Sequence, residues 1–207
     1  MTWSETAGTA QPFDTAFLLP ASFGQRRLWL LQELEPGSGP AYIEHVAVRM
    51  HGPLDDAALQ RSVDALVARH ETLRTAITLV DEEPMQAVAP ELTVPIGRID
   101  LTGDPGRLDE VLRGHVRLPF DLGRAPLFRL ALIRLGEDDH AFAAAFHHAI
   151  YDQWSGSVFV RELLAFYRSF TEGHAPELRE LPIQYGDFAA WQDERTGGAQ
   201  ESAELDH

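Results

Sequence analysis

Two adjoining segments, residues 127–136 and 140–150, constrain what this chain can fold into more than any other feature. Their sequences, LFRLALIRLG and HAFAAAFHHAI, are rich in apolar residues and are joined by the turn-forming residues Gly136 to Asp139. Apolar runs bounded by turn residues are typical of strands, and a short turn between two of them predicts a hairpin. We therefore expect a sheet that contains this strand pair.

Helical and extended patterns alternate along the rest of the chain. Apolar residues recur at three- and four-residue spacing in the expected helices, which lie within 24–37, 53–69, 103–120 and 154–172, with a short helical stretch at 188–194. Extended patterns predict strands at 41–52, 72–80, 84–90 and 93–101. This mixed order predicts an α/β (α+β) two-layer sandwich, with a mixed sheet flanked by helices.

The length of 207 residues fits one domain, or one lobe of something larger, with a substantial core. Residues 1–17 are polar and show no periodicity, so we expect a flexible leader there. Residues 196–207 are polar and acidic, which predicts a disordered tail. The ordered domain is therefore expected over 18–195, and we find no internal repeat in it.

Two residue types are absent from the chain, because all 17 basic residues are Arg and there is no Cys. Without Lys the chain cannot form a pyridoxal-phosphate Schiff base, carry biotin or lipoate, or supply a P-loop lysine. Without Cys it has no thiol nucleophile, disulfide, iron–sulfur cluster or thiolate zinc site. Any chemistry must therefore come from His, carboxylates, hydroxyls and Arg.

The net charge of −15 argues against a nucleic-acid partner, because such binding depends largely on cationic side chains that neutralise phosphates. The N-terminus lacks a basic segment followed by an apolar one, and no run of about 18 apolar residues occurs. We therefore expect a cytoplasmic protein that contacts neither nucleic acid nor membrane.

His147 and His148 form the one adjacent histidine pair, at the end of the apolar strand FAAAF, and Asp152 follows closely. Side chains alternate along a strand, so the two imidazoles should point in opposite directions, which disfavours shared chelation of one metal. Two interpretations remain open from the residues alone. One is a buried His satisfied by a backbone carbonyl, and the other is a His in a cleft that takes a proton.

Four motifs in order resemble the condensation domains of nonribosomal peptide synthetases, a branch of the chloramphenicol-acetyltransferase-like acyltransferases. The segment FHHAIYDQWS resembles the HHxxxDG motif of that family. The other matches are SFGQRRLW at 22–29 (SxAQxRLW), RHETLRTAI at 69–77 (RHExLRTxF) and YGDFAAWQ at 185–192 (YxDFAxW). The approach segment at 119–135 is also similar, so the resemblance covers nearly all of residues 18–195.

The resemblance implies a reaction, partners and residue roles. An acceptor amine attacks a donor thioester to form an amide, and both substrates are carried on the 4′-phosphopantetheine arms of peptidyl carrier proteins, so no cofactor is bound directly. His148 would take the proton of the amine or position the amine and stabilise the tetrahedral species, with His147 packing or hydrogen-bonding nearby. Asp152 would be structural, paired with Arg74 as first choice or Arg69 as second.

The chain also departs from the family pattern. Gln153 stands where the common motif has Gly, and the chain resembles only the first of two lobes, so the second lobe and a neighbouring adenylation domain are implied partners. We expect the isolated lobe to be inactive or nearly so. The alternatives are a non-catalytic half-domain that docks a carrier protein or another synthetase domain, and an acyltransferase that uses free acyl-coenzyme A.

Overall fold

The computed structural model describes residues 16–35 and 37–197, so most of the expected leader and most of the expected tail lie outside the described residues. The helices are α1 (Phe23–Leu34), α2 (Asp56–Arg69), α3 (Leu108–Arg117), α4 (Gln153–Glu172) and α5 (Tyr185–Gly197), with short 3-10 turns η2 (Gly39–Tyr42), η3 (Glu71–Arg74) and η4 (Pro105–Arg107). The strands are β1 (Phe17–Pro20), β2 (Ile43–His51), β3 (Thr75–Val80), β4 (Glu83–Val88), β5 (Gly97–Asp100), β6 (Phe128–Arg134) and β7 (Asp139–His147).

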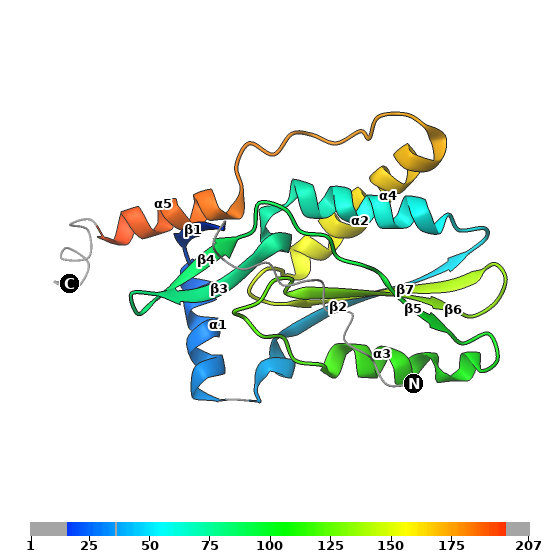
Figure 1. Cartoon of the computed structure of the whole chain (residues 1–207), viewed down its shortest axis with the longest axis horizontal. Helices are drawn as coiled ribbons and strands as arrows, with labels where there is room; N and C mark the ends of the chain where they lie inside the picture. The colour runs from blue at the N-terminus through cyan, green and yellow to red at the C-terminus, as the bar shows by residue number, and fades with distance from the viewer. Residues whose placement is uncertain (1–15, 36, 198–207) are drawn as a thin grey trace.

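A four-stranded sheet in the order β2-β7-β6-β5 forms the centre of the molecule (Figure 1). The expected hairpin is confirmed, because β6 and β7 pair antiparallel with Leu130 opposite Ala144. The strand β2 adds antiparallel to the other side of β7, and β5 pairs parallel with β6. The central strand β7 therefore has neighbours on both sides, and its end at His147 lies inside the sheet.

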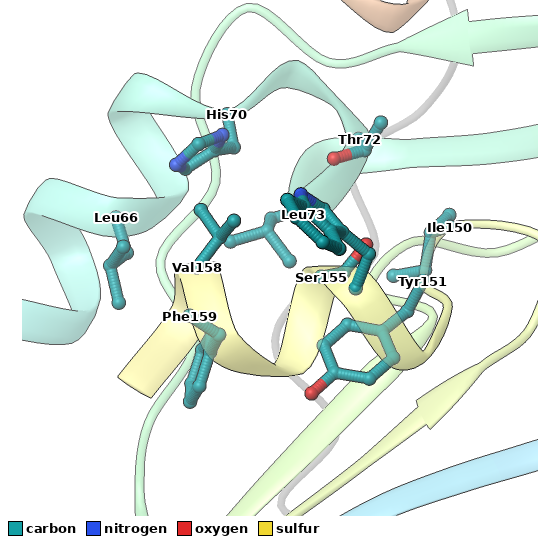
Figure 2. Close-up of a pocket in the computed structure, with 10 residues that line it drawn as sticks. Leu66, His70, Thr72, Leu73, Ile150, Tyr151, Ser155, Val158 and Phe159 are labelled. Carbon is teal, nitrogen blue, oxygen red and sulfur yellow. The ribbon is translucent and has the colours of Figure 1, made fainter. Parts of the chain in front are cut away.

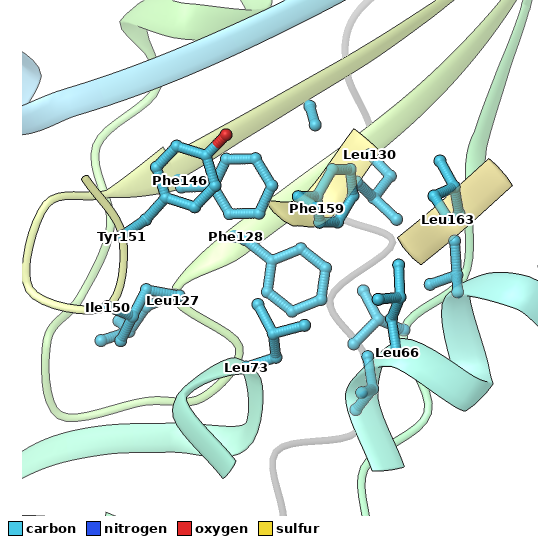
Figure 3. Packing of buried hydrophobic residues seen from close by; sticks show 14 of the residues in the cluster. Leu66, Leu73, Leu127, Phe128, Leu130, Phe146, Ile150, Tyr151, Phe159 and Leu163 are labelled. Carbon is cyan, nitrogen blue, oxygen red and sulfur yellow. The ribbon is translucent and has the colours of Figure 1, made fainter. Parts of the chain in front are cut away.

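Helices cover both faces of this sheet (Figure 1). Alternate residues of β6 and β7 carry large side chains toward α2 and α4, where Phe128 and Phe146 stack at 5.7 Å between ring centroids (Figure 3). The residues between them are small on β7, and Ala141 and Ala143 pack with α3 on the opposite face. The observed α/β architecture confirms the expected fold class.

A second, three-stranded sheet in the order β1-β4-β3 lies beside the first. The strands β3 and β4 form a hairpin whose turn places Asp81 and Glu82 at φ of 50° and 69°. The strand β1 was not expected, and it is extended because it pairs with β4, with Leu19 opposite Gln86. Among the described residues, no helix is long and apolar enough to cross a membrane.

The helices α1 and α5 attach to this smaller sheet. The helix α1 begins at the capping box that the sequence SFGQ provides, in which the Ser22 hydroxyl accepts from the Gln25 N–H and the Gln25 side chain accepts from the Ser22 N–H. The helix α5 starts three residues before the expected stretch and packs on β1. A Cβ at Gly186 would lie 2.3 Å from a methyl carbon of Leu19, so a larger residue there would force the Leu19 side chain to shift.

Candidate active site

The strand β7 ends in a tight turn that reverses the chain into α4. The backbone N–H of His147 donates to the carbonyl of Leu127 (2.8 Å), and that of His148 donates to the carbonyl of Tyr42 (2.8 Å). The N–H of Ile150 then donates back to the His147 carbonyl (3.0 Å) and closes the turn. Every backbone donor from 147 to 150 except Ala149 is thus held by a carbonyl, and Ala149 is held by a side chain.

His147 is completely buried and points toward the α3 side of the sheet, where it packs edge-on against Phe120 and beside Tyr42. Its Nδ1 accepts from the N–H of Ala149 (3.1 Å). Burial, with a smaller contribution from the charge of neighbouring His148, lowers the pKa of His147 to about 4. The ring is therefore neutral near pH 7, with its proton on Nε2, and it braces the turn.

His148 has the opposite environment, as the alternation predicts. Its side chain is 43% exposed, and its Nδ1 lies 2.8 Å from the carbonyl oxygen of Tyr151. A carbonyl can only accept, so Nδ1 carries the proton and donates it. The Nε2 lone pair makes no hydrogen bond to any described residue, and it can accept a proton from a substrate.

The half-exposed carboxylate of Glu44 lies close to His148. The Oε1 atom of Glu44, on the edge strand β2, lies 3.9 Å from Nδ1 of His148. Glu44 is directly opposite Phe146 in the sheet register, so both side chains lie on the same face of the sheet, the face on which Tyr151 stacks. No sequence motif drew attention to Glu44.

Tyr151 anchors the turn to the core. Its ring stacks on Phe146 with centroids 3.9 Å apart and planes 4° from parallel (Figure 3). Burial, with contributions from Glu44 and Asp152, raises the pKa of Tyr151 to about 12, so the phenol stays protonated. A Cβ at Gly156 would lie 3.0 Å from the Tyr151 hydroxyl oxygen, so α4 approaches the ring closely because it has a glycine there.

Asp152 caps α4, and the expected pairing with an arginine is wrong. Its Oδ1 accepts from the backbone N–H (2.8 Å) and the hydroxyl (2.6 Å) of Ser155. These hydrogen bonds lower the pKa of Asp152. Within the described part of the chain, no Arg is in ion-pair contact with Asp152, because a capping carboxylate points along its own helix.

The two arginines expected as partners bind elsewhere. The Nε of Arg69 lies 3.0 Å from Oε2 of Glu162, a buried residue of α4, and His70 Nε2 lies 2.7 Å from the same oxygen. The Nε of Arg74 donates to the carbonyl of Ala89 (2.8 Å), and its Nη2 lies 3.5 Å from Glu71. Arg69 thus ties α2 to α4, and Arg74 holds the start of β3.

Gln153, the departure from the family motif, is the first residue of α4 and is exposed.

A cavity of about 120 Å³ opens beside this end of α4 (Figure 2). It is lined by Leu66, His70, Thr72, Leu73, Ile150, Tyr151, Trp154, Ser155, Val158 and Phe159. The cavity separates the first turn of α4 from η3. Among the described residues, no three His, Asp or Glu side chains are grouped so that they could hold a metal ion.

Gln25 also reaches this turn, although sequence reasoning gave it no role. It is 2% exposed, and its Nε2 donates to the carbonyl of Ala149 and to Oε1 of Gln86, each at 3.1 Å. In the sequence, only its position within the motif SFGQRRLW could have pointed to a role for Gln25.

Comparisons with known proteins show what the chain is similar to. The family model described as "Condensation domain" matches residues 17–206. One of the linear gramicidin synthase proteins of Brevibacillus parabrevis is 41% identical over 191 residues, which are 89% of this chain and 2% of that protein. The chain likewise spans only 1% to 5% of the curated relatives that it matches.

Two solved structures are similar over most of the chain. The first condensation domain of the calcium-dependent antibiotic synthetase, in complex with a substrate analogue, has a TM-score of 0.78 at 25% identity and matches 90% of this chain and 47% of its own. The X-domain in a complex with OxyB from teicoplanin biosynthesis has a TM-score of 0.77 at 29% identity, with coverage of 88% and 39%. The chain thus spans less than half the length of either solved chain.

Proposed function

Because the chain belongs to the condensation domain family, we propose that it contributes His148 to amide bond formation between two carrier-bound substrates. The acceptor amine attacks the carbonyl carbon of the donor thioester, and a C–N bond forms. The C–S bond breaks, the thiolate leaves on the donor's phosphopantetheine arm, and the proton lost by the amine ends on that sulfur. The donor acyl group is then an amide on the acceptor.

One observation carries this proposal, namely the orientation of the His148 imidazole. The hydrogen bond from Nδ1 to the Tyr151 carbonyl leaves the basic lone pair on Nε2, on a ring that is 43% exposed. A group in this state can take the proton of an attacking amine, or hold the amine in place, without a prior change of tautomer. A positioned base contributes about 10²–10⁴-fold to such reactions, which suffices for a thioester that is already activated.

We further propose that the chain acts as the N-terminal lobe of a larger domain. Its match to less than half of a solved condensation domain supports this. The donor and acceptor carrier proteins, a second lobe and an adenylation domain would then be its partners. Since the exposed side of His148 would face the second lobe, the 207 residues alone should catalyse little or no condensation.

The test is an amide-forming assay with two loaded carrier proteins and detection of the product by mass spectrometry. The 207-residue chain should give no product above background, and the complete domain should turn over. His148→Ala in the complete domain should reduce kcat at least about 10²-fold. A His174→Ala variant, altered at an exposed histidine just beyond the end of α4, is the matched control and should keep full activity.

Two outcomes would contradict the proposal. Turnover by the 207 residues alone would show that no second lobe is needed. Unchanged turnover in His148→Ala would remove the role of His148. Replacing the donor carrier with free acyl-coenzyme A in the same assay separates the carrier-dependent reaction from that of an ordinary acyltransferase.

A docking function is the second candidate, and it is favoured by the similarity to the X-domain that was solved in complex with OxyB. A pull-down against carrier proteins and neighbouring synthetase domains would test it, with wild type and His148→Ala compared. Docking without dependence on His148, together with no turnover in the complete domain, would favour the binding module. The charge of −15 disfavours an acidic partner, because like charges repel.

A further inference from the structure

A chain of two buried side-chain amides runs from the smaller sheet to the turn that carries His148. Gln86 of β4 donates from Nε2 to the Pro20 carbonyl (2.8 Å), and its Oε1 accepts from Gln25 (3.1 Å). Gln25 in turn donates its second amide hydrogen to the carbonyl of Ala149 (3.1 Å), while its Oε1 accepts from the Ser22 N–H (2.9 Å). Both glutamines are at most 2% exposed.

Such an arrangement has a definite orientation. The Ala149 carbonyl can only accept, so Nε2 of Gln25 must face it and Oε1 must face Ser22. Each polar atom of the Gln25 side chain is used, which is what makes its burial tolerable, because an unpaired buried amide is costly. The side chain is therefore fixed in one position and one orientation.

Gln25 holds the peptide unit between Ala149 and Ile150, one residue beyond His148. Ala149 is gripped on both sides, since its N–H donates to Nδ1 of His147 and its carbonyl accepts from Gln25. The imidazole of His148 is oriented by the carbonyl of Tyr151 in the same turn. The position of that carbonyl relative to His148 depends on the backbone at Ala149, which lies between them.

We propose that Gln25 is a positioning residue, which acts through the Ala149 carbonyl to hold the His148 turn so that Nδ1 keeps its proton and Nε2 faces the substrate. Gln86 fixes Gln25, and the smaller sheet thereby supports a group at the end of the larger one. The catalytic consequence rests on the proposed function, but the effect on the turn does not.

The test uses the 207-residue chain and the variant Gln25→Met, which keeps the length of the side chain and removes its donors and acceptor. The reference is Ile133→Ala, a core variant of β6 opposite Ala141 on the α3 side of the sheet, which lowers stability at a site away from the turn. Two quantities are measured, namely hydrogen exchange of the amides from 147 to 151 and the imidazole ¹⁵N shifts of His148, which report the tautomer.

We expect Gln25→Met to speed exchange of the turn amides about tenfold more than Ile133→Ala does, because Gln25→Met removes a local hydrogen bond, whereas Ile133→Ala lowers only the global stability. The ¹⁵N shifts should report the Nδ1–H tautomer in wild type and in Ile133→Ala, and a mixture of tautomers in Gln25→Met. Where Gln25→Met fails to fold, Gln25→Leu, which is apolar and also lacks the donors and the acceptor, takes its place with the same expected results.

Equal exchange in the two variants after correction for stability, or an unchanged His148 tautomer in Gln25→Met, would overturn the inference. Neither the amide exchange nor the His148 tautomer depends on whether the chain turns over substrate. If His148→Ala keeps its activity while Gln25→Met still loosens the turn, the proposed function fails and the positioning role stands.

Discussion

His147 and His148 are neighbours in sequence, but the protein uses them in opposite ways. Burial keeps His147 neutral, with its pKa lowered to about 4, so it serves as a fixed acceptor for the Ala149 N–H. His148 lies 43% exposed with Nε2 directed away from the turn's hydrogen bonds. A buried residue of this kind supports stability, and only an accessible one can meet a substrate.

The buried state of His147 makes stability depend on pH. Its pKa is about 4 when folded and about 6.5 when unfolded, so between these values the unfolded state binds the extra proton. Its contribution to the free energy of unfolding should therefore be fully present above pH 6.5 and should fall by about 3 kcal/mol as the pH decreases to 4. Chemical denaturation at several pH values measures how steeply the free energy of unfolding changes with pH.

Burial lowers the pKa of His115 to about 4 as well, so two histidines contribute to the acid sensitivity. The variant His147→Gln removes one of them, so its free energy of unfolding should change less steeply between about pH 4 and 6 than that of wild type. His174→Gln is the matched control, because His174 is exposed and its pKa is raised by the hydrogen bond to Glu172. A wild-type slope in His147→Gln would mean that other groups cause the acid sensitivity.

At the level of elements, α4 is held at its start by a cap and in its middle by an ion pair. Asp152 satisfies the N–H of Ser155, and Glu162 binds Arg69 and His70 at the end of α2. The first interaction is exposed and local, and the second is buried and joins two helices. They should differ strongly in their contribution to stability.

Asp152→Asn should leave the free energy of unfolding within about 0.5 kcal/mol of wild type, because Asn also caps helices well, whereas Asp152→Ala should cost about 1 kcal/mol. Urea denaturation of the 207-residue chain measures both. A large loss in Asp152→Asn would show that the negative charge, and hence a cationic partner, matters more than the cap.

Glu162→Ala should cost about 3–5 kcal/mol, because it leaves Arg69 without its carboxylate in a site where Glu162 is only 3% exposed. Glu172→Ala, at the exposed end of the same helix, is the control and should change little. Thermal and urea unfolding check this, and a loss below about 1 kcal/mol would mean that water replaces the carboxylate at Arg69.

On the scale of the whole molecule, the net charge of −15 should govern encounters with partners. If the partner is an acidic carrier protein, association should be faster at about 0.5 M salt than at about 0.02 M, because screening weakens the repulsion. Surface plasmon resonance at several salt concentrations measures this. Slower association at high salt would instead indicate contact through a cluster of arginines.

The sequence was sufficient for the β6–β7 hairpin of the larger sheet, because both strands have long apolar runs and an evident turn, and their pairing is local. It was insufficient for β1, whose four residues FLLP show no alternation and become a strand only against β4. The partner of Asp152 was also missed, although its cap on Ser155 is only three residues away, because the family resemblance directed the expectation to an arginine. Gln25 contacts residues 61 and 124 positions away, and no local pattern encodes those distances.

The opposite orientations of the two imidazoles have a consequence for how such a chain can change over generations. The parity of β7 decides which histidine enters the core and which one faces outward. Deletion or insertion of a single residue between Asp139 and His147 would exchange their environments even if the strand still formed. Selection should therefore remove insertions and deletions in this strand among functional descendants. They should be tolerated in the connection between α4 and α5, where side chains do not alternate between two faces.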